Sequence, residues 1–202
     1  MSSVSAVSEP DGDLRGRLVR AGVELLEGQG AQALSLRAIA RHAGVSHGAP
    51  RRYFPTHLEL LSAIARQGFL DLGERVGEAL TAAPGTARGR LTVLGRVYLG
   101  FARERPGMYE LMFRHDLLES GRLGLRETSL PLFAVLTDLV GRAGVRDDAD
   151  AADAAVVAGV LWANLHGIAQ LWAWGSLRLA TGADDVEPLL RAALDAHLGP
   201  EH

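Results

Sequence analysis

Two adjacent arginines, Arg51 and Arg52, lie in a short segment that ends at Pro55. Guanidinium groups make bidentate, charge-assisted hydrogen bonds with phosphate oxygens. Between Asp13 and His57 the chain carries seven arginines and three acids, a formal net charge of +4, whereas the whole chain carries −3. A basic segment inside a slightly acidic chain is typical of phosphate-backbone binding, so these residues predict contact with nucleic acid.

Two short helices joined by a tight turn are predicted around these arginines. Ser35 is a suitable N-cap for a helix that ends at His42, and Gly44 can adopt the positive φ that terminates it. Ser46 is then predicted to cap a second helix, which must end before Pro55. This pattern is a helix-turn-helix, whose second helix enters the major groove of DNA. An ordinary helical hairpin has the same pattern, and the basic charge favours DNA binding.

Pro50 is an unusual residue within the second predicted helix. With Ser46 as the N-cap, Pro50 falls at the fourth helical position, where proline removes the first intrahelical hydrogen bond. We therefore expect this helix to start late or to have an irregular first turn. Thr56 and Glu59 then form a capping box that predicts the start of a third, longer helix.

The rest of the chain is also predicted to be helical, which makes the fold class all-α. Apolar residues recur at helical spacing, and no stretch alternates with a period of two. Pro131 is expected in the first turn of its helix, where a missing N–H costs little. The predicted helices include residues 14–27, 56–80, 91–101, 106–113, 129–141, 149–175 and 184–198.

Four short motifs resemble the DNA-binding domain of the TetR family of bacterial transcriptional regulators. They are Leu36-Arg37-Ala38-Ile39-Ala40, Ala43-Gly44-Val45-Ser46, Tyr53-Phe54-Pro55 and Leu58-Glu59-Leu60-Leu61. A narrower resemblance, to the subgroup with a W-x-x-x-H-G signature, comes from Trp162-Ala163-Asn164-Leu165-His166-Gly167 and Pro106-Gly107-Met108-Tyr109-Glu110-Leu111-Met112-Phe113. The polar N-terminal residues 1–12 are predicted to form a disordered tail. The resemblance implies a helix-turn-helix domain (13–57) and a helical ligand-binding and dimerisation domain (58–202).

Two positions depart from the family pattern at expected DNA contacts. Arg51 stands where family members usually have tyrosine, and His57 where they usually have lysine. Arg51 can still bind phosphate, whereas His57 is a weaker substitute because imidazole is largely neutral above a pKa of about 6.5. The DNA-binding residues that we expect are Ser35, Arg37, Ser46, His47, Gly48, Ala49, Arg51, Arg52, Tyr53 and His57.

The last two long helices suggest a homodimer. The helix over residues 149–175 is apolar on nearly all sides, and such a helix needs cover on both sides. Both helices could instead pack within one chain. The family resemblance implies a two-fold dimer through a four-helix bundle, which we favour. Such a dimer would place two recognition helices about 34–36 Å apart and so read a palindromic double-stranded DNA operator.

Large aromatic and sulfur-containing side chains predict a second site in the C-terminal region. Ligand cavities are mainly apolar, and methionine suits a cavity that accepts varied shapes. Each such residue could equally belong to the core, and His166 could orient a ligand, lie at the dimer seam or be a satisfied core histidine. We expect a small apolar or amphipathic effector, with candidate ligand-binding residues Tyr98, Phe101, Met108, Tyr109, Met112, Phe113, Phe133, Trp162, His166 and Trp172.

No motif predicts an enzyme, a metal site or a cofactor. The sequence lacks H-E-x-x-H, a Gly-rich phosphate loop and a nucleophile elbow, and without cysteine it has no thiolate chemistry. The longest apolar run, residues 154–163, is shorter than the roughly 20 residues that span a membrane. We therefore expect no membrane partner and a cytoplasmic protein.

The function predicted from the sequence is a ligand-responsive dimeric transcriptional regulator. We expect a repressor that binds a palindromic operator and is released by a small molecule. An activator, or a regulator controlled by a protein partner, would have the same fold, and the sequence does not separate these roles. An all-α enzyme is the least favoured alternative.

Overall fold

The computed structural model describes residues 11–83, 85–114, 116–117, 124–144 and 151–199, and every regular element in these ranges is helical. This confirms the predicted all-α class. The elements are α1 (Asp11–Gln29), η1 (Ala31–Ala33), α2 (Leu36–His42), α3 (Ala49–Tyr53), α4 (His57–Thr81), α5 (Ala87–Glu104), α6 (Pro106–Met112), α8 (Leu125–Arg142), α9 (Ala151–Ala173), α10 (Ser176–Thr181) and α11 (Glu187–Leu198).

The N-terminal tail predicted over residues 1–12 lies mostly outside the described residues. Its last two residues, Asp11 and Gly12, are helical and form the start of α1, so the tail prediction was wrong there.

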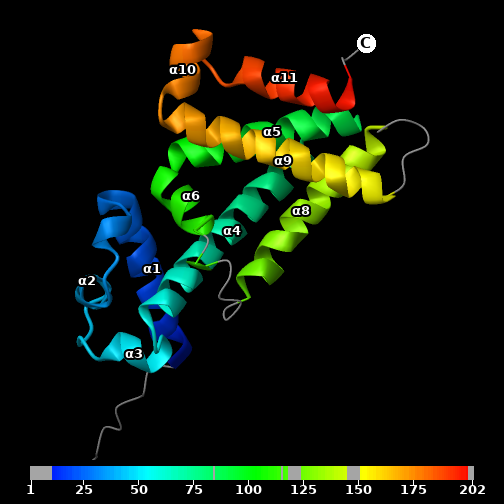
Figure 1. The fold of residues 1–202 in the computed structure, drawn as a ribbon. Coiled ribbons are helices and arrows are strands. Elements are labelled where there is room, and N and C mark those ends of the chain that lie inside the picture. The colour runs from blue at the N-terminus through cyan, green and yellow to red at the C-terminus, as the bar shows by residue number, and fades with distance from the viewer. Residues whose placement is uncertain (1–10, 84, 115, 118–123, 145–150, 200–202) are drawn as a thin grey trace, which may run out of the picture.

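The long helix α4 connects the two parts of the molecule. Figure 1 shows α1, α2 and α3 grouped around one end of α4, while α5, α8 and α9 lie at the other end. Helix α4 contacts α1 in the first group and α5 and α8 in the second, and it also contacts α6. The buried apolar residues form one cluster that runs from Leu18 in α1 to Leu194 in α11. Packing is therefore continuous between the helix-turn-helix and the C-terminal helices.

Both ends of α2 form as local sequence chemistry predicts. The Ser35 hydroxyl accepts a hydrogen bond from the Ala38 N–H at 3.1 Å, which caps the helix. At the other end Gly44 has a φ of +68°, and the Val45 N–H donates to the Ala40 carbonyl at 3.0 Å. This is a Schellman motif, which turns the chain sharply toward α3.

Helix α3 starts later than Ser46, as Pro50 predicted. The specific prediction that Ser46 caps the helix was wrong, because Gly48 occupies the N-cap position and α3 begins at Ala49. The Ala49 N–H donates to the Ser46 carbonyl at 3.0 Å, which forms a turn ahead of the helix. Pro50 therefore lies in the first turn, where its missing N–H would have had no helical partner.

Helix α8 starts one turn earlier than predicted, at Leu125, so the expectation that Pro131 lies in the first turn was wrong. Two features favour the earlier start. Gly124 adopts a φ of +63°, and the buried Leu125 side chain anchors the first residue in the core. Pro131 consequently lies inside the helix and leaves one carbonyl of the preceding turn without its intrahelical donor.

The C-terminal helix predicted over residues 149–175 ends at Ala173, and the short α10 follows it. Gly175 causes the break, because its φ of +76° is compatible with the N-cap of α10 and not with a continuing helix. Figure 1 shows α10 turning the chain so that α11 returns along α9. Helix α11 packs against both α9 and α5.

Candidate DNA-binding surface and ligand cavity

The turn before α3 and α3 itself present polar and basic side chains to solvent. Ser46, His47, Arg51 and Arg52 are exposed, whereas Pro50 is buried against the rest of the domain. Because Pro50 holds one side of this short helix in the core, the other side carries the two arginines outward. The predicted phosphate-binding residues therefore share one accessible surface.

Phe54 anchors this surface to the domain core. Its side chain is fully buried at the C-cap of α3, and the Arg15 guanidinium carbon lies 5.1 Å from the ring centroid. A second anchor, which the sequence did not indicate, is the hydrogen bond from Arg17 Nη2 to the Ala43 carbonyl at 3.1 Å. The first contact joins the end of α3 to α1, and the second joins the end of α2 to α1.

The other predicted DNA-binding residues have varied environments. Arg37 is exposed on α2, while Gly48 and Ala49 start α3 and Tyr53 is half-buried at its end. The Ser35 hydroxyl is already engaged as the cap of α2. One nitrogen of the His57 ring is hydrogen-bonded to the Leu34 carbonyl, which joins the start of α4 to the segment before α2.

A cavity of about 490 Å³ lies in the C-terminal helices. It is bounded by α4, α5, α8 and α9, together with the end of α6. Its walls are almost wholly apolar, as in most small-molecule sites. The lining residues are Phe69, Leu72, Val76, Leu94, Tyr98, Phe113, Arg126, Ser129, Leu130, Leu132, Phe133, Leu136, Gly159, Trp162 and Ala163.

Four of the ten candidate ligand-binding residues line this cavity: Tyr98, Phe113, Phe133 and Trp162. The other six are Phe101, Met108, Tyr109, Met112, His166 and Trp172, and they are not part of its wall. Most of the aliphatic residues of the wall lie on α4 and α8, and sequence reasoning missed them because their types do not distinguish a cavity from a core.

The six other candidates have identifiable neighbours. Met108 and Met112 pack where α6 crosses α4 at Gly68, because a Cβ on this glycine would lie within 3 Å of both sulfur atoms. Phe101 lies beneath two arginines, and the Trp172 ring lies beneath the Arg178 guanidinium. Tyr109 and His166 form a polar cluster behind the cavity wall.

This polar cluster joins the cavity wall to His166. The Trp162 indole N–H donates to the Tyr98 hydroxyl at 3.3 Å, and the Tyr98 and Tyr109 hydroxyl oxygens are 2.9 Å apart. The Tyr109 hydroxyl lies 2.7 Å from His166 Nδ1, and the Tyr98 hydroxyl lies 3.0 Å from the same nitrogen. A chain of donors from Trp162 through Tyr98 and Tyr109 to an accepting Nδ1 satisfies three of these four contacts, because each hydroxyl has one proton and none is left for the contact between Tyr98 and Nδ1.

Burial keeps the members of this cluster uncharged. It raises the pKa of Tyr98 to about 12 and also raises the pKa of Tyr109, while desolvation lowers the pKa of His166. At neutral pH the phenols are therefore protonated and the imidazole is neutral. Within the described part of the chain, no group of three histidine or acidic side chains could hold a metal ion.

One side of α9 carries exposed apolar residues. Val156, Val160 and Leu171, with Trp174 just beyond the helix, are 65%, 46%, 39% and 72% exposed, and their spacing places them on one side.

By length and composition alone, residues 154–173 of α9 could also cross a membrane. The uninterrupted apolar run over residues 154–163 did not indicate this, because it is shorter. The same composition is found in the packed helices of folded domains, and α9 packs against α5, α8 and α11.

Comparison with known families covers both parts of the chain. Residues 18–64 match the family described as bacterial regulatory proteins, tetR family. Residues 91–197 match the tetracyclin repressor-like, C-terminal domain. A solved Rhodococcus sp. RHA1 protein of unknown function is 29% identical, with a TM-score of 0.73 and coverage of 96% of this chain and 97% of its own.

A TetR-family transcriptional regulator from Streptomyces coelicolor is 30% identical over 92% of this chain and 99% of its own, with a TM-score of 0.60. A nucleoid occlusion factor, SlmA of Aliivibrio fischeri (strain MJ11), is 29% identical over 114 residues. That match covers 55% of this chain and 58% of the relative, so it spans little more than half of the relative's length.

The chain therefore belongs to the TetR family of transcriptional regulators. It binds DNA through its N-terminal helix-turn-helix domain, and its C-terminal domain is helical. Members of this family are regulators and not enzymes.

Proposed function

We propose that this protein is a cytoplasmic, dimeric repressor that binds a palindromic operator and leaves it when a small molecule occupies the cavity. The observation that carries this proposal is the position of α4. Phe69, Leu72 and Val76 on α4 line the cavity, and the same helix begins at His57, directly after the helix-turn-helix. A change in the cavity walls therefore acts on a rigid element that reaches the DNA-binding domain.

The exposed apolar side of α9 supports the homodimer. A two-fold interface uses the same surface on both subunits, and burial of this side would cover Val156, Val160 and Leu171. His197 of α11 is hydrogen-bonded to Asn164 on the adjoining part of α9 at 2.7 Å. The proposed interface is the four-helix bundle formed by α9 and α11 of each subunit.

The cavity favours an apolar effector without a positive charge. Among the described lining residues, Arg126 is the charged one, and it is exposed at the cavity edge. Tyr98 in the wall is held neutral by burial, as are Tyr109 and His166 behind it. A buried cation would find no carboxylate partner among the described lining residues, and an unpaired buried charge is costly.

The proposed mechanism is a shift between two populations of the dimer. One population places the two helix-turn-helix domains at the operator spacing, and the other is favoured by an occupied cavity. A ligand can change this equilibrium only through its different affinities for the two states. The required difference is modest, since typical coupling changes affinity by about 5- to 150-fold.

The test of DNA recognition is selection of binding sites from random duplex DNA with the purified protein. We expect a palindrome whose half-sites are centred about 34–36 Å apart, which is the separation of two successive major-groove faces. Recovery of fragments without a shared sequence would contradict the proposed operator binding. The recovered palindrome also supplies the DNA for the experiments below.

Replacing Arg51 or Arg52 with alanine is expected to weaken binding to operator and to random DNA alike. Each variant removes two phosphate contacts from a dimer, so the slope of log affinity against log salt should fall by about 1.8. Fluorescence anisotropy over a series of salt concentrations measures this slope. Arg142→Ala, which removes an exposed arginine of α8, is the matched control and should leave the slope unchanged. Loss of sequence discrimination with an unchanged slope would instead make the residue a base reader.

A further inference from the structure

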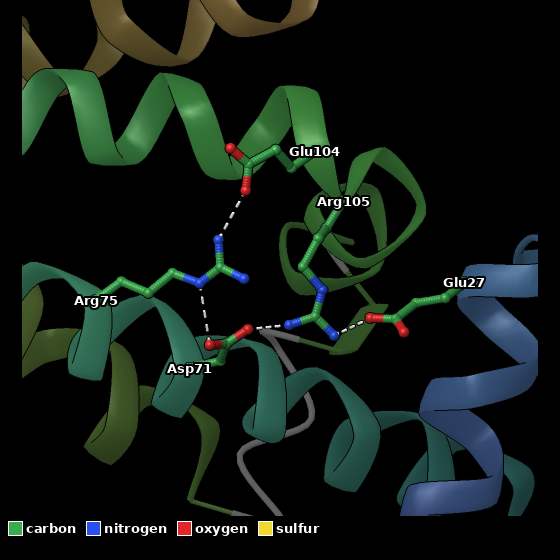
Figure 2. Close-up of polar contacts among 5 residues, drawn as sticks. All are labelled: Glu27, Asp71, Arg75, Glu104 and Arg105. Atoms are coloured by element: carbon green, nitrogen blue, oxygen red, sulfur yellow. Dashed lines mark hydrogen bonds and ion pairs between the residues drawn. The ribbon is translucent and has the colours of Figure 1, made fainter.

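The corner between α5 and α6 is tied to the DNA-binding domain by one arginine. Arg105, which precedes α6, directs one N–H group to the Asp71 carboxylate on α4 and another to the Glu27 carboxylate on α1 (Figure 2). The Arg105 and Asp71 side chains are 17% and 24% exposed, whereas the Glu27 side chain is 45% exposed, so the contact with Asp71 is the better shielded of the two. A single guanidinium thus joins the helix-turn-helix domain, the connecting helix and the C-terminal domain.

Neighbouring groups fix the position of this guanidinium. Arg75 donates to Asp71 at 3.1 Å and to Glu104 at 2.9 Å, so Asp71 receives both arginines. The guanidinium carbons of Arg75 and Arg105 lie 5.3 and 5.6 Å from the centroid of the buried Phe101 ring. Figure 2 shows the five charged side chains as one connected set between α1, α4 and α5. Arginine suits such a junction because its planar fork has a defined hydrogen-bonding direction.

Helix α6 connects this junction to the cavity. Its C-cap residue, Phe113, lines the cavity and contacts the rings of Phe69 and Trp162 at centroid distances of 5.6 and 6.2 Å. Near its other end α6 packs on α1, because a Cβ on Gly107 would lie 3.4 Å from the Leu26 side chain. The helix has seven residues and is therefore about 10 Å long. Because α6 is a short helix with Arg105 at one end and Phe113 at the other, a displacement of Phe113 would also move Arg105.

We propose that Arg105 is a positioning residue for operator binding, because its bridge between Glu27 and Asp71 holds the helix-turn-helix domain at the orientation that the operator requires. Occupation of the cavity displaces α6 through Phe113 and weakens this bridge. Apolar packing between α1 and α6 allows small rotations, whereas a guanidinium held by two carboxylates opposes them. The regulatory part of this inference rests on the proposed function.

The test compares Glu27→Gln, Arg105→Gln and the double variant in binding to the selected operator. Each single variant is expected to lower operator affinity by about tenfold, within the usual range of coupling between sites. The double variant should lose no more than either single variant, because both remove the same bridge. The two substitutions change the net charge in opposite directions. A shared loss of affinity therefore cannot come from simple attraction to DNA.

Affinity for random DNA should stay within about twofold of wild type in both variants, since neither residue lies on the α3 surface. Arg96→Gln is the matched control: it removes a two-nitrogen contact with Glu187 between α5 and α11, away from α1, and should preserve operator affinity. Arg105→Lys should recover part of the loss. Additive losses in the double variant, or a loss in Arg105→Gln alone, would overturn the proposal.

Hydrogen–deuterium exchange of the free protein gives a readout that does not depend on an operator. Glu27→Gln and Arg105→Gln should both accelerate amide exchange in α1 by a similar factor, while Arg96→Gln should not. If the wild-type protein selects no palindrome but α1 exchange responds in this way, the proposed repressor function fails and the bridge stands. Unchanged exchange in both variants would refute the bridge itself.

Discussion

Replacing Val160 with glutamate is expected to dissociate the dimer and to weaken operator binding by about 10⁴-fold. Val160 lies on the exposed apolar side of α9, which the proposed bundle buries. A two-fold interface contains the substitution twice. An uncompensated buried charge costs about 3 kcal/mol or more, so the two carboxylates together cost roughly 6 kcal/mol, which corresponds to about 10⁴-fold in affinity.

Sedimentation equilibrium and operator binding together measure this effect. The Val160→Glu protein should sediment as a folded monomer with unchanged helical content and should bind single half-sites weakly. Leu70→Glu is the control, because Leu70 is a similarly exposed apolar residue, 41% accessible, on α4. A Val160→Glu dimer with wild-type operator affinity would show that the subunits associate through another surface.

Replacing Phe54 with alanine is expected to destabilise the protein by about 4 kcal/mol and to abolish operator binding. The Phe54 ring is fully buried, and it anchors the end of α3 beneath the two exposed arginines. Its removal leaves a cavity that Arg15, which stacks on the ring, cannot fill without burying its charge. The arginines would then no longer be held in one orientation.

Urea unfolding followed by circular dichroism gives the change in the free energy of unfolding. Leu179→Ala on α10 is the control, because Leu179 is 89% exposed and its truncation should change stability by less than about 0.5 kcal/mol. A Phe54→Ala protein of nearly wild-type stability that binds operator normally would contradict the role given to this ring.

The parts of the fold that could be predicted from the sequence depend on local chemistry. Ser35, Gly44 and Pro55 each act within one turn of the chain, and the ends of α2 and α3 follow from them. The start of α3 was harder to place because Ser46 and Gly48 are both acceptable N-caps. The choice is made by Pro50, whose missing N–H costs little in the first turn of a helix that begins at Ala49.

The cavity could be predicted only in part. The type of a residue does not show which residues from distant parts of the sequence lie next to it in the fold. The aromatic residues Tyr98, Phe113, Phe133 and Trp162 were identified, but the aliphatic wall on α4 and α8 was not. The Arg105 bridge was missed for the same reason. Its carboxylate partners lie 78 and 34 residues away, and only the tertiary packing brings them together.

Operator affinity at increasing concentrations of a ligand that fills the cavity is the most direct test of whether the cavity controls operator binding. Ligands are found by quenching of Trp162 fluorescence, since this side chain lines the cavity, with Trp162→Phe as the control for binding at other sites. Saturation with such a ligand is expected to lower operator affinity by about 5- to 150-fold and to leave binding to random DNA unchanged. Ligands that occupy the cavity without any change in operator affinity would contradict the proposed coupling between the cavity and the DNA-binding domain.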